Sequence, residues 1–177
     1  MAHIHTEPGQ HDHTVSMYIV RTDGEEPRMM FHLHKKFNIY LQFGGHIELD
    51  ENPMGAMTHE LREEVGYDMS QMQILQPKGS LRKLEGAVIH PVAAVHNTHH
   101  IPGDHYHTDL GYALTTDQDP AHSPDEGESN EVIFCTREEL VALPAEKVIE
   151  NSREIALYVF DYILENWEPV SPLEFAL

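Results

Sequence analysis

The stretch GHIELDENPMGAMTHELREEVGY, residues 45–67, decides the fold of this chain. Asn52 followed by Pro53 is typical of a helix start, because Asn caps the free N–H groups and Pro suits the first helical position. Gly66 is typical of a helix end, where a left-handed residue often follows the last turn. The stretch therefore predicts a helix that begins at Asn52–Pro53 and ends at about Val65.

This helix carries three acids along one side. At about 100° per residue, Glu60, Glu63 and Glu64 fall within an arc of roughly 100°. The arc borders an apolar stripe, so the acids lie at the edge of the core; the stripe consists of Met54, Leu61 and Val65. Carboxylates at this spacing repel each other, and a hard divalent cation such as Mg²⁺ removes that repulsion. A solvated acidic face is the alternative.

The order of these residues resembles the Nudix box, G-x5-E-x7-R-E-U-x-E-E-x-G-U, in which U is a bulky aliphatic residue. Gly45 is followed at the required spacing by Glu51, and the acids and glycine of the second half stand at their required positions. Two positions depart from the pattern: His59 replaces the arginine, and Tyr67 replaces the last aliphatic residue.

The resemblance implies an α/β protein with the Nudix-type α/β/α sandwich and a mixed β-sheet. It also implies hydrolysis of a diphosphate bond in a nucleoside diphosphate linked to another moiety. In this family, water attacks phosphorus with the help of Mg²⁺ or Mn²⁺, which lowers the pKa of the attacking water. The expected partner is therefore a small-molecule nucleotide or another diphosphate, and homodimers are frequent in the family.

The resemblance also assigns roles to the residues of the box. Glu63 and Glu64 match the main metal-binding acids, and Glu60 matches an acid that contacts metal or activates water. The Gly45 carbonyl matches a backbone metal ligand, and Glu51 matches a supporting acid at the helix start.

Three further residues are tied to this site by the resemblance. The family's arginine orients the neighbouring acids by hydrogen bonds, and His59 can donate such a bond with a charge that depends on pH. A late acid, in the loop before the last strand, often completes the site in this family. Glu128 and Glu131 are the candidates, and for each a solvated place in an acidic loop is the alternative.

Histidine is abundant, with 15 residues in the chain. His107 and Asp109 share one face of a predicted strand with His105, and His32 and His34 share a face of an earlier one. If the two strands are neighbours, these residues line a pocket that contacts substrate or holds a second metal; exposed polar strand faces are the alternative. A zinc site is also considered at the end of another strand, at His96, His99 and His100.

The remaining sequence predicts one domain with a short N-terminal extension. Residues 1–13 are polar and histidine-rich and predict a mobile arm, and 14–177 form the Nudix hydrolase domain. Apolar patterning predicts strands and helices in the order of a mixed sheet covered on both faces. Strands are expected at 15–20, 28–33, 39–43, 72–75, 87–99, 106–115 and 131–135, with helices at 137–143 and from Ser152 onward.

Composition limits the classes of function. The 177 residues suit one domain, and the formal net charge of −19 disfavours a grip on nucleic acid. The single cysteine, Cys135, is expected in the core and excludes an internal disulfide, so a reducing cytoplasm is the expected compartment. No apolar run approaches the length of a membrane helix.

Two other classes of protein fit parts of the pattern. One is a catalytically weak Nudix-fold nucleotide sensor, which would follow if the change to His59 abolished turnover. The other is a histidine-rich metal-binding protein, which would follow if the histidines bind metal and no hydrolysis takes place.

Overall fold

A mixed sheet of nine strands lies between helices in this computed structural model, which describes residues 4, 7–35, 37–102 and 105–175. The two long central strands, β1 (His11–Arg21) and β7 (His105–Thr116), run parallel and pair from His11 opposite Tyr106 to Arg21 opposite Thr116. All other strand pairs are antiparallel.

The other strands extend the sheet on both sides of this central pair. One edge of β1 pairs with β2 and β4, and the free edge of β7 pairs with β5 and β6. These strands are β2 (Arg28–His34), β3 (Ile39–Leu41), β4 (Phe43–His46), β5 (Gln73–Pro77), β6 (Val95–Ile101), β8 (Val132–Cys135) and β9 (Trp167–Val170).

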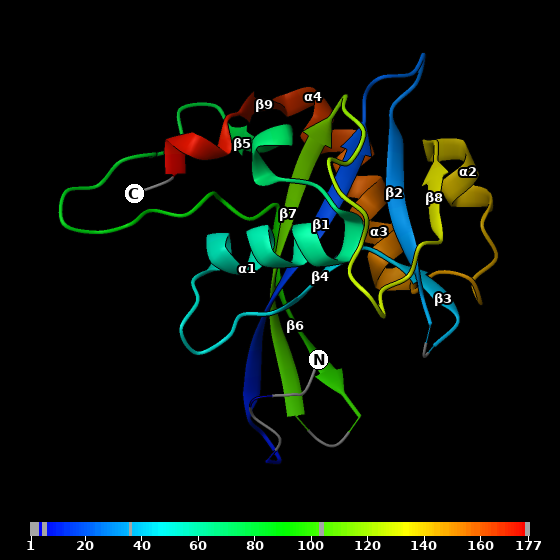
Figure 1. Cartoon of the computed structure of the whole chain (residues 1–177), viewed down its shortest axis with the longest axis horizontal. Coiled ribbons are helices and arrows are strands. Elements are labelled where there is room, and N and C mark those ends of the chain that lie inside the picture. The colour runs from blue at the N-terminus through cyan, green and yellow to red at the C-terminus, as the bar shows by residue number, and fades with distance from the viewer. Residues whose placement is uncertain (1–3, 5–6, 36, 103–104, 176–177) are drawn as a thin grey trace.

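Helices cover the two faces of the sheet, as Figure 1 shows. On one face lies α1 (Pro53–Glu60), which continues into a π-helical turn, η1 (Leu61–Val65). On the other face lie α3 (Glu150–Tyr158), the π-turn η3 (Val159–Ile163) and α4 (Leu164–Asn166). The short elements are α2 (Arg137–Ala142), η2 (Met69–Gln71) and η4 (Pro172–Phe175). The predicted α/β/α sandwich with a mixed sheet is therefore confirmed.

Side chains that alternate along the central strands form two hydrophobic cores, one on each face of the sheet. Residues 15, 17 and 19 of β1 pack with α1, whereas residues 18 and 20 pack with α3. On β7, residues 112 and 114 face α1, and residue 113 faces α3. Because side chains alternate between the two faces, whether a position has an odd or even number (its parity) gives the face of each remaining side chain on these strands.

The predicted arm of residues 1–13 is wrong at its end. Residues 11–13 belong to β1, and Asp12 is fully buried. The prediction failed there because it relied on apolar residues, and this end of β1 is polar. Residues 1–3 and 5–6 of the arm lie outside the described residues.

Three other elements differ from the prediction. The helix predicted from Ser152 onward is α3, which begins at Glu150 with Ile149 as its cap. Ser152 is buried, and its hydroxyl donates to Gln42 Oε1 at 2.7 Å. The expected strand over 87–99 begins only at Val95. Strand β9 was not predicted, because Pro169 disfavours a strand interior, yet an edge strand tolerates it.

Within the described residues, no helix combines the length and the apolar character needed to cross a membrane.

Candidate active site

The acids of the 45–67 stretch lie where α1 passes into the π-turn. Asn52 Oδ1 caps the helix by accepting from the Gly55 N–H at 3.0 Å, as its sequence predicts. Ala56, Met57 and Leu61 are fully buried against the sheet, which fixes the rotation of the helix. The acids are therefore held at the border of the core. π-turns of this kind are frequent at functional sites.

Glu64 is held by the sheet. The Gly44 N–H donates to Glu64 Oε2 at 2.8 Å. Only glycine suits this position, because its φ is +139° and an added Cβ would lie 2.1 Å from the Val15 carbonyl oxygen. Burial raises the pKa of Glu64 well above its ordinary value, although the Gly44 hydrogen bond acts in the opposite direction.

Glu60 is the most deeply buried of the three acids, with 2% of its surface exposed. Its Oε1 has no hydrogen-bond partner among the described residues. The pKa of Glu60 is raised to about 7; burial is the largest cause, His59 acts in the opposite direction, and Glu63 and Glu128 add to the rise. A buried carboxylate oxygen without a donor, next to other acids, fits a divalent cation, which stabilises the ionised forms.

His59 bridges two acids of the box. Its Nε2 lies 2.7 Å from Glu63 Oε1, and its Nδ1 lies 3.3 Å from Glu51 Oε1. The hydrogen bond to Glu63 raises the pKa of His59. The imidazole thus contacts the acids on both sides of it, which is the orienting geometry expected from the arginine it replaces.

The acidic loop over 117–130 packs onto the end of the helix. The Asp125 N–H donates to the Glu63 carbonyl at 2.8 Å, and the His122 N–H donates to the Gly66 carbonyl at 2.9 Å. Lys35 Nζ holds the same loop through the carbonyls of Gly127 and Glu128, at 2.7 and 2.6 Å. The loop is therefore anchored beside the three acids.

The two late acids differ in their surroundings. Glu128 is half-buried, and its charge raises the pKa of both Glu60 and Glu64. Glu131 Oε1 instead accepts from the Tyr40 hydroxyl at 2.5 Å. The charge of Glu128 therefore acts on the acids of the box, whereas Glu131 is bound to Tyr40.

The four candidate strand residues do not share a pocket. Strand β1 lies between β2 and β7, so the two strands are not neighbours. His32 has the parity of Met30, faces α1, and lies with Nε2 3.8 Å from Glu64 Oε1. His107 and Asp109 have the parity of residue 113 and face the α3 side of the sheet.

His32 and His34 both lie beside aromatic rings. The His32 ring is 4.9 Å from that of Phe43, and the His34 ring stacks on that of Phe37 at 4.6 Å. Burial, with a smaller contribution from His34, lowers the pKa of His32 to about 4. A neutral His32 is thus placed next to Glu64, inside the candidate site.

On the opposite face, Asp109 belongs to a buried polar network. Thr14 Oγ1 and Ser16 Oγ donate to Asp109 Oδ1 at 2.7 and 3.0 Å. Burial raises the pKa of Asp109, and these hydrogen bonds lower it. The contacts account for Asp109 as a residue that ties β7 to β1.

The NUDIX domain family model matches residues 10–158, and no curated protein matches the chain. The chain belongs to the Nudix family. It is accordingly a Nudix-type hydrolase acting on diphosphate bonds, and the match begins at residue 10, close to the start of β1.

Solved structures share the Nudix fold with this chain. A NUDIX-family hydrolase from Clostridium perfringens is 30% identical, with a TM-score of 0.70 over 85% of this chain and 96% of the other. An Ap4A hydrolase from C. elegans is 12% identical, with a TM-score of 0.61 over 87% and 98%. The dihydroneopterin triphosphate pyrophosphohydrolase of E. coli is 14% identical, with a TM-score of 0.59 over 90% and 99%. The last two show similarity of fold alone.

Proposed function

We propose that this Nudix hydrolase is a pyrophosphohydrolase dependent on Mg²⁺ or Mn²⁺, which cleaves a diphosphate bond in a nucleoside diphosphate linked to another moiety. The observation that carries the proposal is the buried Glu60 oxygen without a hydrogen-bond donor, next to Glu63, Glu64 and Glu128. A protein with a net charge of −19 needs a cation to hold a diphosphate.

Glu60, Glu63, Glu64 and the Gly45 carbonyl would hold the cation. Among the described residues, the side-chain ligand atoms that lie within 4.8 Å of one another belong to a different group, so these acids would share the cation with ligands from outside the protein. This suits Mg²⁺, which commonly binds through one or two carboxylates together with waters and substrate phosphates. When bound, the cation neutralises the diphosphate and lowers the pKa of the attacking water.

The other residues position these acids. His59 lies between Glu63 and Glu51 and contacts both, and the Gly44 N–H donates to Glu64. Glu60 either contributes a ligand or accepts the proton of the attacking water. Glu128, placed by Lys35 and the acidic loop, adds a further carboxylate near Glu60 and Glu64.

Hydrolysis of a panel of nucleotide diphosphate derivatives, with Mg²⁺ or Mn²⁺ present, tests this proposal. Glu63→Gln removes one charged oxygen without changing size, and we expect kcat/KM to fall at least about 100-fold, the equivalent of roughly 2.7 kcal/mol. Glu154→Gln, exposed on α3, is the matched control and should keep full activity. Equal rates for Glu63→Gln and the wild type would reject this site.

The same panel separates the enzyme from a sensor on the same fold. Nucleotide binding measured by calorimetry, without release of phosphate or monophosphate for any substrate, would support the sensor. Turnover that disappears on chelation and returns with Mg²⁺ or Mn²⁺ would support the enzyme and its metal.

A further inference from the structure

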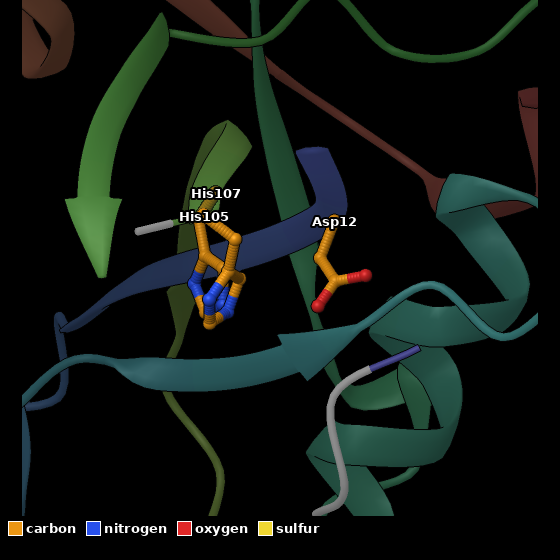
Figure 2. Close-up of side chains that lie close together, drawn as sticks. All are labelled: Asp12, His105 and His107. Carbon is orange, nitrogen blue, oxygen red and sulfur yellow. The ribbon is translucent and has the colours of Figure 1, made fainter. Parts of the chain in front are cut away.

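A cluster of metal-ligating side chains lies on the sheet face opposite to α1. Asp12 of β1 and His105 and His107 of β7 each offer one ligand atom, and these atoms lie within 4.8 Å of one another. Asp12 is directly opposite His107 in the parallel pair, so the two side chains project from the same face. Figure 2 shows all three side chains pointing to the same side of β1 and β7.

Two further histidines border this cluster from neighbouring strands. His46 of β4 has its Nε2 3.5 Å from Asp12 Oδ2, and its ring is 4.9 Å from that of His107. The ring of His99 on β6 lies 5.4 Å from that of His107, on its other side. Four adjacent strands thus direct imidazoles and a carboxylate to one place.

Burial distinguishes this cluster from a solvated polar surface. Asp12 is 0% exposed and His105 is 3% exposed, while His107 is half-buried. A buried carboxylate is costly unless a positive charge or strong donors compensate it. A divalent cation bound to Asp12 and two imidazoles would be one such positive charge, in a chain whose formal net charge is −19.

The cluster is separate from the proposed hydrolytic site. Asp12 has the parity of Tyr18 and Val20, which pack on the α3 side, whereas Glu60 and Glu64 border the core on the α1 side. A metal here would join the start of β1 to the start of β7. Figure 1 shows this end of the two strands extending past α1, away from the helices of the described part of the chain.

We propose that Asp12, His105 and His107 form a second metal site, specific for a divalent transition-metal ion and distinct from the Mg²⁺ site. Two imidazoles and one carboxylate suit Zn²⁺ and related ions, whereas Mg²⁺ prefers oxygen ligands alone. In a tetrahedral zinc site, ligand atoms are roughly 3.4 Å apart, so small side-chain rotations close the cluster around the ion. His46 or His99 is placed to supply a fourth ligand.

The alternative is a metal-free polar cluster in which an imidazolium balances Asp12. Calorimetric titration of the metal-stripped full chain with Zn²⁺, in excess Mg²⁺ so that the acids of α1 are not the zinc site, separates the two. We expect one zinc site whose affinity falls at least about tenfold in Asp12→Asn and in His107→Gln. His96→Gln, exposed on the same β6–β7 hairpin but on the other face, should bind zinc as the wild type does.

Two controls keep the test decisive. The double variant His3→Ala/His5→Ala measures zinc held by the N-terminal histidines, and it should retain the site. If Asp12→Asn fails to fold by circular dichroism, His107→Gln and the zinc-induced shifts of imidazole nitrogens in ¹⁵N NMR of the wild type decide. Equal zinc affinity in His107→Gln and the wild type, or loss of all binding in the His3/His5 variant, would overturn the proposal.

Discussion

At the scale of single residues, His59 shows how a substitution in the Nudix pattern is accommodated. An arginine reaches two acids with its planar fork of donors. The imidazole of His59 reaches two acids because Glu63 lies one helical turn away and Glu51 lies just before the helix cap. Both ring nitrogens face a carboxylate, so the protonated ring satisfies both.

This geometry predicts how variants of His59 behave. His59→Arg restores the fork of donors and should keep kcat/KM close to that of the wild type. His59→Leu removes both contacts, releases Glu63, and should lower kcat/KM about tenfold in saturating Mg²⁺. Steady-state hydrolysis of the best substrate of the panel measures both effects. A His59→Leu enzyme as active as the wild type would show that the bridge does not position Glu63.

Residues whose roles follow from local spacing could be predicted, and residues brought in from elsewhere could not. The helix start at Asn52, the helix end at Gly66 and the arc of three acids follow from one stretch of sequence. The choice between Glu128 and Glu131 could not be made from sequence, because it depends on how the acidic loop folds back onto the helix. Asp12 was missed, since it lies 93 residues from His105 in the chain.

At the scale of elements, the acidic loop over 117–130 is the part of the site that the sequence describes least. It contains no regular structure, yet it is held by backbone hydrogen bonds to Glu63 and Gly66 and by Lys35. Lys35 binds two successive carbonyls, which positions the backbone that carries Glu128. The lysine thus acts on the site through the loop.

The loop contacts predict a specific effect of Lys35→Met. Loss of the two hydrogen bonds should loosen the loop and lower kcat/KM about fivefold, with little change in unfolding free energy because Lys35 is exposed. Lys78→Met, an exposed lysine on a different loop, is the control. Hydrogen exchange should become faster at residues 122–128 in Lys35→Met alone. Unchanged exchange there would mean that Lys35 does not anchor the loop.

Elements with apolar faces were predictable, and polar or edge elements were not. Strands β2 and β8 and the helix after Asn52 appear close to where their apolar patterns place them. The start of β1 was not predicted as part of the strand because its inward side chains are polar. Two of them, Thr14 and Ser16, form hydrogen bonds with Asp109 on β7. Strand β9 was not predicted because it contains a proline, which a central strand would not accept but which edge pairing with β5 permits.

At the scale of the whole molecule, the sheet divides the chemistry of the chain between its two faces. The acids of α1 and η1 lie on one face together with His32, and the histidine cluster with Asp12 lies on the other. One central pair of strands, β1 and β7, supports both. Global unfolding should therefore disrupt both sites together, whereas metal bound at one site need not alter the other.

Cys135 provides a direct measure of that global unfolding. It is the only cysteine, it is buried in the core between the sheet and α3, and burial raises the pKa of its thiol to about 11. The reactive form is the thiolate. A pKa raised from 9.0 to about 11 leaves roughly 100-fold less thiolate at pH 8 than in the unfolded chain. Labelling by iodoacetamide should therefore be slow in the folded protein and fast in urea.

The labelling rate then reports which metal stabilises the fold as a whole. Zn²⁺ bound at Asp12, His105 and His107 should slow labelling of Cys135 at moderate urea, because a ligand that binds only the folded state lowers the population of the unfolded state. His107→Gln should lose this protection and His96→Gln should keep it. Cys135 lies on β8, apart from the cluster, so protection by zinc that persists in His107→Gln would mean that the ion acts through ligands other than the cluster.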